Sequence, residues 1–215
     1  MFTTRLNHIK LCGLALALLS NIASAAIIDQ ANDGVYAGGF TINAGPIGQS
    51  FQPGLTSLDF VELLINDQNP GFGTGDDIAV RIRDATITGT ILGSSQNVFF
   101  ADQAPQSPFQ VPQIVHFDFT SAVMMIPGQS YVIEVFRNGA VSSDLGIFGT
   151  GFNNDAYVNG DSYFQGALYT GTGAPLDLWF REGVSAVPLP AALPLLLSGL
   201  SLLVFARKTQ RKPVV

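Results

Sequence analysis

The stretch Ile114-Val-His-Phe-Asp-Phe119 decides the fold class, because apolar and polar residues alternate along it with a period of two. In an extended strand the three apolar residues from Val115 onward share one face, while His116 and Asp118 lie on the other. The same alternation recurs in Ile78-Ala-Val-Arg-Ile-Arg83, where the two arginines share a face. This period predicts strands that are buried on one face and exposed to solvent on the other.

Other short apolar or alternating runs are separated by Gly, Asn, Asp and Pro residues, which are typical of turns. They predict further strands at Gln49–Phe51, Leu58–Ile65, Val98–Ala101, Tyr131–Arg137, Leu145–Phe148, Ser162–Tyr169 and Leu176–Arg181. No long stretch among these runs has a convincing helical period. The sequence therefore predicts an all-β domain, an antiparallel β-sandwich of jelly-roll type, with helices only at the two ends of the chain.

Charge divides the chain into three parts. All 16 acidic residues lie between Asp29 and Glu182. The only basic residues in that region are four arginines, so its net charge is −12. Nucleic acid requires a basic surface for its phosphates and is therefore excluded as a partner, whereas cations, neutral glycans and basic proteins are compatible.

The first 25 residues have the layout of a cleavable signal peptide. Arg5 and Lys10 precede the apolar run Leu11–Leu19, and signal peptidase would read the small residues Ala23 and Ala25. The apolar run is too short to span the roughly 30 Å hydrocarbon core of a bilayer. We therefore expect export and a folded domain at residues 26–184. The only cysteine, Cys12, lies in this leader, so no disulfide is expected in the domain.

Residues 185–215 have the layout of a sorting segment: a motif at 187–192, an apolar stretch at 193–206 that is expected to be a transmembrane helix, and a basic tail at 207–215. Counted from the motif onward, a helix of about 20 residues would rise about 30 Å, enough to cross a bilayer. The basic cluster would keep the tail in the cytoplasm. The motif consists of Val187, Pro188, Leu189, Pro190, Ala191 and Ala192, and the basic cluster of Arg207, Lys208, Arg211 and Lys212.

This segment resembles the C-terminal signal of PEP-CTERM proteins, which Gram-negative bacteria export and a membrane protease called exosortase processes. It departs from that pattern at Leu189, where Glu usually stands, and at Leu193-Pro194, where an aromatic residue often begins the helix. The resemblance implies an inner-membrane intermediate, cleavage near Pro188–Pro190, and release or attachment at the cell surface or in the extracellular matrix, commonly alongside exopolysaccharide. A plain single-span anchor that is never cleaved remains the alternative.

The domain itself is similar to carbohydrate-binding jelly rolls that recur in such exported proteins. The similarity lies in mostly strand and turn residues, at Gln49–Gly54, Val80–Asp84, Ile91–Ser95, Phe117–Phe119, Pro127–Glu134 and Asp177–Arg181. It therefore implies a fold more than a ligand.

Catalysis has little support in the sequence. Outside the leader His116 is the only histidine, and no nucleophile elbow, metalloprotease helix motif or phosphate loop occurs. The pair Asp76-Asp77 follows Gly73-Thr-Gly75 and has the character of a turn. We expect no enzyme; a secreted hydrolase that uses paired carboxylates to cleave glycans is the alternative.

Calcium is the one candidate cofactor, because hard cations prefer carboxylates and carbonyls clustered on turns. Two acidic stretches offer such groups, although the same residue types also form ordinary turns. The candidate ligands are Asp67, Asp76, Asp77, Asp155 and Asp161.

For glycan binding, the useful side chains are aromatic rings exposed beside polar groups. Tyr157 and Tyr163 flank Asn159 and Asp161 in a loop-like stretch, and Trp179 either packs in the core or offers its ring to a sugar. The sequence thus predicts a surface or extracellular-matrix protein without enzymatic activity that binds exopolysaccharide. Its expected partners are signal peptidase, the exosortase and the membrane.

Overall fold

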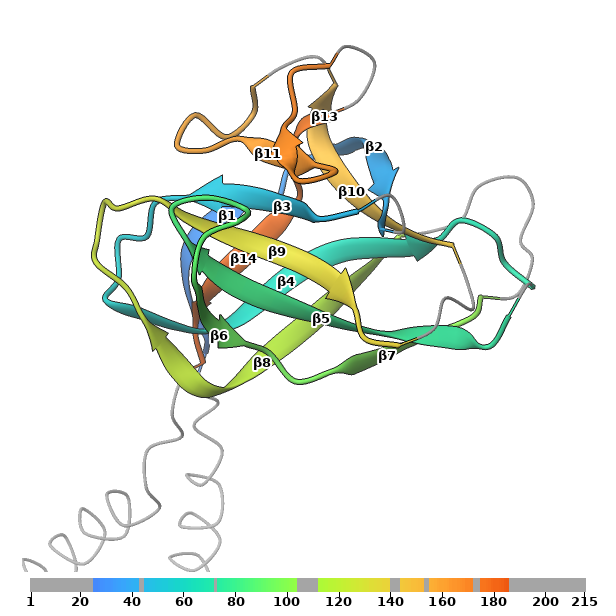
Figure 1. The fold of residues 1–215 in the computed structure, drawn as a ribbon, viewed down its shortest axis with the longest axis horizontal. Helices are drawn as coiled ribbons and strands as arrows, with labels where there is room; N and C mark the ends of the chain where they lie inside the picture. Colours follow the sequence, from blue (N-terminus) through green and yellow to red (C-terminus); the bar gives the residue numbers. More distant parts are fainter. Residues whose placement is uncertain are drawn as a thin grey trace, which may run out of the picture. The chain divides into compact units, whose positions relative to one another are not determined.

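The structure, a computed structural model, describes residues 25–42, 45–71, 73–103, 112–139, 144–152, 155–171 and 175–185. Residues 26–185 form one compact unit. The described residues form 14 β-strands in two antiparallel sheets and contain no α-helix (Figure 1). The predicted all-β class is confirmed.

One sheet, which we call sheet A, is built around the long strand β4. Strand β8 pairs with one edge of β4, while β14 and then β10 pair with the other edge. Strand β1 adds to β14, and both β2 and β13 pair with β10. The strands of sheet A are β1 (Ile27–Asn32), β2 (Tyr36–Thr41), β4 (Ser57–Asp67), β8 (Gln113–Met124), β10 (Leu145–Phe152), β13 (Pro175–Leu178) and β14 (Phe180–Val184).

The second sheet, sheet B, has the order β12-β11-β3-β9-β5. Strands β6 and β7 both pair with β5, at its far and near ends respectively. The strands of sheet B are β3 (Ile47–Phe51), β5 (Gly75–Asp84), β6 (Ile91–Ser94), β7 (Val98–Ala101), β9 (Tyr131–Arg137), β11 (Ser162–Phe164) and β12 (Ala167–Leu168).

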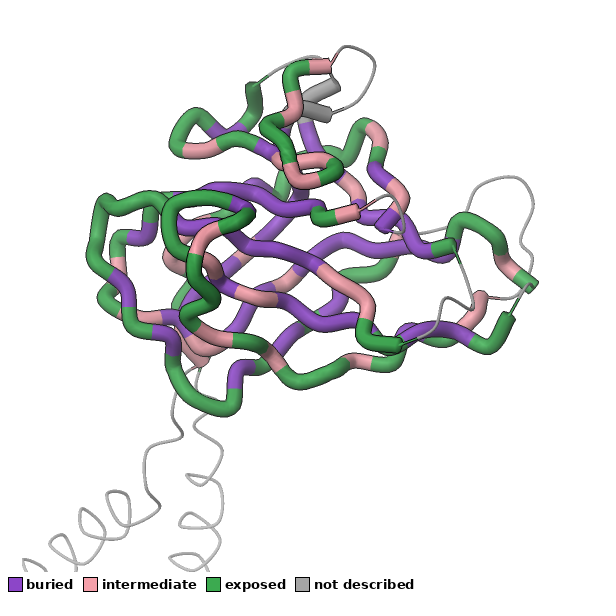
Figure 2. The backbone as a smooth tube through the Cα atoms, in the orientation of Figure 1, coloured by how far each residue is buried: buried purple, intermediate pink, exposed green. Residues whose placement is uncertain are grey.

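The apolar core is shared by the two sheets. The buried set includes Val61 and Leu63 of β4 together with Val80 and Ile133 of sheet B. The burial pattern follows the strands, with buried segments in the middle of the domain and exposed segments in its loops (Figure 2). The ring of Phe51 in sheet B lies 6.4 Å from that of Phe180 in sheet A, centroid to centroid. Side chains from both sheets therefore interdigitate in one core.

The predicted alternation is confirmed in both deciding stretches. Ile78, Val80 and Ile82 are fully buried, and Val115, Phe117 and Phe119 are at most 7% exposed, whereas His116 and Asp118 are exposed. Val98–Ala101 and Tyr131–Arg137 match β7 and β9 to the residue.

Three strands, β1, β2 and β6, were not predicted, because they are short or rich in glycine and carry a weak apolar pattern. In β2, Gly39 is required by packing, since a Cβ there would lie 2.5 Å from the carbonyl oxygen of Ile147. The predicted strand Ser162–Tyr169 is a hairpin of β11 and β12, which turns at Gln165 and Gly166 with positive φ.

The first and last strands of the domain are neighbours. Ile27 of β1 pairs with Val184 of β14, so the described chain enters and leaves the domain on adjacent strands. None of the described residues forms a helix that is long and apolar enough to cross a membrane. Residues 1–24 of the predicted signal peptide, including Ala23, lie outside the described residues, as do the sorting motif, apolar segment and basic tail at 187–215.

Candidate functional site

Two of the three aromatic candidates are buried. Tyr157 is 7% exposed and packs edge-on against Phe180, with ring centroids 5.1 Å apart, while its hydroxyl donates to Gln30 Oε1 at 3.0 Å. Trp179 is 4% exposed and lies between β13 and β14. The expectation of an exposed ring is therefore wrong for Tyr157, and of the two positions considered for Trp179 the structure shows the buried one. Tyr163 is half-buried in β11.

The five aspartates considered for calcium do not assemble into one group. Asp67 is fully buried and accepts the backbone N–H groups of Asn69 and Gln103, at 2.9 and 3.0 Å. Asp76 lies 3.1 Å from the Arg137 guanidinium. Asp67 therefore fixes a turn, and Asp76 forms a buried ion pair.

The remaining three aspartates are exposed. Asp77 points away from Asp76, because both lie in strand β5; the prediction of a turn at this pair is wrong. Asp155 and Asp161 are exposed, and the backbone N–H of Asp161 donates to Ser50 Oγ at 2.7 Å. Among the described residues no three His, Cys, Asp or Glu side chains are placed to hold a metal together. A calcium site stays a prediction.

A pocket of about 260 Å³ lies beside strand β9. Ile42, Gly45 and Pro46 line it from one side, and residues 134–137 of β9 from the other. Strand β3 pairs with β9 only as far as Ile47 and Val135, so the edge of β9 beyond that pair has no β3 partner. We call this recess the β9 pocket.

The side chains of the β9 pocket follow from the strand alternation. Ile133 and Val135 face the core, so Glu134 and Phe136 lie on the other face of sheet B. The register places Arg81 of β5 directly opposite Glu134. Its guanidinium carbon lies 3.6 Å from the Phe136 ring centroid, which is a cation–π contact.

Glu134 is neutralised by two arginines. It is only 4% exposed, and its Oε2 lies 2.6 Å from Arg83 Nε and 3.9 Å from Arg81 Nη1. Arg83 also donates to the carbonyl of Gly89 at 2.8 Å. Two cations thus surround one buried carboxylate, in a region whose net charge is −12.

Sequence reasoning did not find this pocket. The alternation placed Arg81 and Arg83 on one face of a strand, and Tyr131–Arg137 was predicted as another strand. Only the pairing of β5 with β9 brings Glu134 and Phe136 to those arginines, and a single sequence does not show which strands are neighbours.

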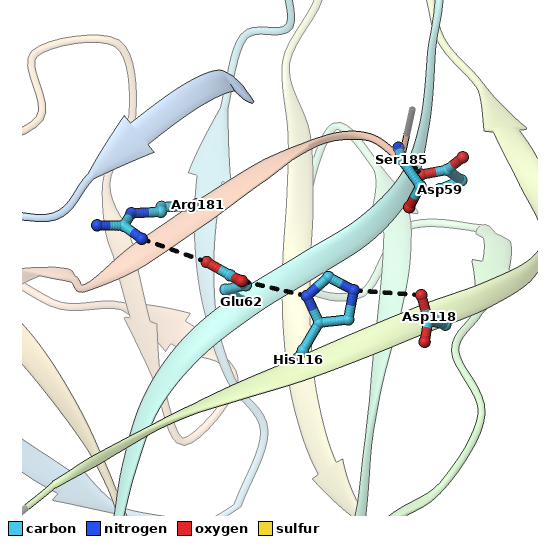
Figure 3. A network of polar contacts seen from close by, with 6 residues as sticks. All are labelled: Asp59, Glu62, His116, Asp118, Arg181 and Ser185. Carbon is cyan, nitrogen blue, oxygen red and sulfur yellow. Dashed lines mark hydrogen bonds and ion pairs between the residues drawn. The ribbon is translucent and has the colours of Figure 1, made fainter. Parts of the chain in front are cut away.

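A second polar feature crosses the face of sheet A that is turned away from the core; we call it the polar row. It runs from Arg181 of β14 through Glu62 of β4 to His116 and Asp118 of β8 (Figure 3). Glu62 lies 3.5 Å from Arg181 Nη1 and 3.1 Å from His116 Nδ1. Asp118 Oδ1 lies 3.2 Å from His116 Nε2, and Asp33 lies 3.0 Å from Arg181 Nε at the other end.

The polar row is satisfied within itself. Both ring nitrogens of His116 contact carboxylates, so no ring nitrogen is left to take a proton from a substrate (Figure 3). The imidazole stacks on Phe60 at 5.0 Å, and the Arg181 guanidinium lies 5.1 Å from the Trp179 ring. The predicted exposure of His116 is confirmed, with 42% of its side chain exposed.

No protein-family model matches this sequence, and no curated protein matches it. The chemistry of the two features therefore decides between them. The charges of the polar row are paired with one another, whereas the β9 pocket is a recess lined by the Phe136 ring and the Glu134 carboxylate, both of which contact Arg81. Ligand sites are usually concave and apolar with a few convergent polar groups, so the β9 pocket is the better candidate.

Proposed function

We propose that this protein is an exported surface or extracellular-matrix protein, sorted by its C-terminal segment, whose jelly-roll-like β-sandwich binds polysaccharide through the β9 pocket without acting on it. The observation that carries this proposal is the meeting of Phe136, Glu134 and Arg81 at a recess of about 260 Å³.

Sugars require the groups that this pocket supplies. A sugar ring has apolar faces that pack on aromatic and aliphatic side chains, and its hydroxyls both donate and accept hydrogen bonds. Phe136 and Pro46 offer apolar surface and Glu134 can accept, while Arg81, which contacts both Phe136 and Glu134, adds donors beside the pocket lining. Because two arginines offset the charge of Glu134, the site carries no net negative charge that would repel a neutral or an acidic sugar.

The size of the pocket suits one sugar unit and not a long segment. Sites for drug-sized ligands occupy roughly 300 to 1,000 Å³, and the β9 pocket is slightly smaller than this range at about 260 Å³. A chain end or a side branch of a polysaccharide would therefore be the part that enters.

The two ends of the chain support export and sorting. Strand β1 begins at Ile27, directly after the predicted cleavage site at Ala25, and β14 ends at Val184, directly before the predicted motif.

Binding is tested with the purified protein and the exopolysaccharide of its host, by affinity electrophoresis. We expect Phe136→Ala to weaken binding by about tenfold, because the lost ring contact is worth roughly 1 to 2 kcal/mol. Phe99→Ala is the matched control, since Phe99 is a 59% exposed phenylalanine of β7 that does not line the pocket. Equal binding by the wild type and Phe136→Ala, or no binding by the wild type, would refute the pocket.

Sorting is tested separately, by mass spectrometry of the mature C-terminus in the native host. We expect the surface form to end near Pro188–Pro190 and to lack Arg207 and the residues after it. A surface form with an intact tail would favour the uncleaved anchor, and it would leave the test of the pocket unaffected.

A further inference from the structure

Glu182 is a buried acid without a hydrogen-bond partner. It pairs with Val61 in the ladder between β14 and β4, so its side chain lies on the core face of sheet A. The residue is 0% exposed, and neither carboxylate oxygen has a hydrogen-bond partner among the described residues. An ionised carboxylate in such a place is costly, so the neutral acid is favoured.

A second carboxylate, that of Asp29, lies in a β-bulge on the neighbouring strand β1, next to Gln30, which pairs with Glu182. The register between β1 and β14 shifts between Ile28 and Gln30, which makes Asp29 the extra residue of the bulge. Asp29 Oδ2 accepts the backbone N–H groups of Gly54 and Leu55, at 2.7 and 2.9 Å. Asp29 therefore ties the beginning of β1 to the turn before β4.

Within the described ranges, the titratable groups that act on Glu182 and its neighbour Tyr157 are acidic or neutral. Asp29 approaches from β1, Asp177 from β13, and Tyr157 from the loop before β11, where Glu182, Asp29 and Asp177 all act on its hydroxyl. Arg181, the nearest cation in sequence, binds Glu62 and Asp33 on the opposite face of the sheet. The charge of an ionised Glu182 would thus be uncompensated.

The same surroundings shift the titration of these groups. Burial, and after it the Asp29 carboxylate, raise the pKa of Glu182 to about 8, although the Gln30 backbone acts in the lowering direction. Burial likewise raises the pKa of Tyr157 to about 12.

We propose that Glu182 and Asp29 form a proton-dependent latch, in which neutral Glu182 allows β1 to stay on β14 and ionised Glu182 repels Asp29 and releases the beginning of β1. The released part is short. Asn32 Nδ2 donates to the carbonyl of Leu178 at 2.8 Å, and Asp33 pairs with Arg181 at 3.0 Å, so the far end of β1 remains attached.

Strand β1 is suited to such local opening. It is an edge strand, and β14 is the only described strand that pairs with it. Ile27 and Ile28 are 58% and 44% exposed, so detaching them sacrifices little apolar burial. Opening of this kind leaves the rest of sheet A paired.

The direction of the pH effect follows from linkage. In the released state Glu182 is solvated and titrates near its ordinary value of 4.5, whereas in the closed state it titrates at about 8. The opening constant should therefore rise by about tenfold per pH unit between about pH 4.5 and pH 8, and level off above that range. Acid closes the latch and neutral to alkaline conditions loosen it.

Hydrogen–deuterium exchange of the purified full chain in mild detergent tests the latch. The measured quantity is the exchange rate of the amides of residues 27–30 divided by that of the β9 amides in the same sample, which cancels the intrinsic pH dependence. We expect this ratio to rise by at least tenfold from about pH 5 to pH 8 in the wild type and to stay flat in Glu182→Gln. Glu62→Gln, a glutamate on the opposite face of the same sheet, should behave like the wild type.

Three outcomes of the exchange experiment would overturn the latch. A wild-type ratio that does not change with pH, or a ratio that rises equally in Glu182→Gln, overturns the latch. Millimolar calcium that suppresses the rise in the wild type would show that a cation, and not the proton, supplies the missing charge, and it would also overturn the proposal. Because no polysaccharide is present, the result is independent of binding at the β9 pocket.

Discussion

Asp177 and Glu182 are two buried carboxylates on consecutive strands, and their surroundings differ in one respect. They are 1% and 0% exposed, respectively. Asp177 accepts the backbone N–H groups of Ala156 and Tyr157, at 2.8 and 3.0 Å, and the Gln49 amide at 3.1 Å. Among the described residues neither carboxylate oxygen of Glu182 accepts a hydrogen bond of good geometry, and only the Gln30 backbone favours its charged form. The comparison teaches that the supply of donors, more than depth of burial, decides whether an interior acid becomes a fixed structural element or a titrating one.

Their titration reflects this difference. For both side chains burial raises the pKa above its ordinary value. Each has an acidic neighbour that adds to the rise, Asp155 for Asp177 and Asp29 for Glu182. Three N–H donors lower the pKa of Asp177 again, whereas for Glu182 only the Gln30 backbone acts in that direction. Hydrogen bonds to the charged form favour it, and a like charge disfavours it.

The donors of Asp177 also join the two sheets. Gln49 of β3 is fully buried, and its Nε2 donates to Asp177 while its Oε1 accepts the N–H of Leu178 at 2.7 Å. Both halves of one amide thus connect sheet B to strand β13 of sheet A. A polar group that is fully satisfied in this way can be buried without a large penalty.

The largest effect is expected from Asp177→Asn. If the new side-chain carbonyl accepts from the N–H groups of Ala156 and Tyr157, the new NH₂ group faces the Gln49 Nε2 donor. Rotating the Gln49 amide by 180° would remove this clash but break the hydrogen bond from the Leu178 N–H to Gln49 Oε1. One buried donor is left unpaired in either case, so we expect a loss of about 2 to 4 kcal/mol in the free energy of unfolding.

Urea denaturation at neutral pH measures this loss. Asp155→Asn, an exposed aspartate in the neighbouring loop, is the control and should change stability by less than about 0.5 kcal/mol. Equal stability of the two variants would mean that the donors around Asp177 contribute nothing.

Glu182→Gln should act in the opposite direction and depend on pH. A folded-state pKa raised from 4.5 to about 8 means that the native state is increasingly penalised as pH rises through this range. The ceiling of the penalty is roughly 5 kcal/mol, at about 1.4 kcal/mol per pH unit. Because the new amide also lacks partners, we expect a net gain of about 1 to 3 kcal/mol at pH 8 that fades by about pH 5.

Denaturation of wild type and Glu182→Gln at several pH values measures this gain. A gain of the same size at about pH 5 and pH 8 would assign it to packing and not to charge. A loss of stability at about pH 8 would mean that ionised Glu182 has a partner that compensates its charge.

The sequence predicted the fold better than it predicted the interior chemistry. The two-residue period around Val80 and Phe117 depends on local geometry alone, so it correctly separated core from surface. The burial of Tyr157 depends instead on Phe180 and Gln30, which are distant in the sequence, and it was not predicted. Glu182 follows directly after the predicted strand end at Arg181, so its place on the core face was missed as well.

The β9 pocket could not be predicted from the sequence for a similar reason. Each of its strands was predicted, and the shared face of Arg81 and Arg83 was predicted too. The contact of Arg81 with Phe136 and Glu134 requires the pairing of β5 with β9, which is a long-range property of the fold. Alternation determines which face a side chain occupies, and strand order determines which neighbours it meets on that face.

The smallest effect on the free energy of unfolding is expected from a substitution in the polar row, where Asp118 is an exposed carboxylate to compare with the buried Asp177 and Glu182. Asp118 is 64% exposed in its side chain and contacts the 42% exposed side chain of His116 at 3.2 Å. Water already solvates both groups, and exposed ion pairs are worth about 0 to 1 kcal/mol. We therefore expect Asp118→Asn to change the free energy of unfolding by less than about 0.5 kcal/mol, as measured by urea denaturation.

Salt sharpens this last test. Any small effect of Asp118→Asn on the free energy of unfolding should disappear at about 1 M salt, where exposed charges are screened within about 3 Å. The loss of stability in Asp177→Asn should persist, because salt does not screen a buried unpaired donor. If Asp118→Asn instead cost more than about 1 kcal/mol at both salt concentrations, exposure would not separate the two classes of carboxylate. The polar row would then behave as one cooperative network across β14, β4 and β8, held together by the contacts of Glu62 with both Arg181 and His116.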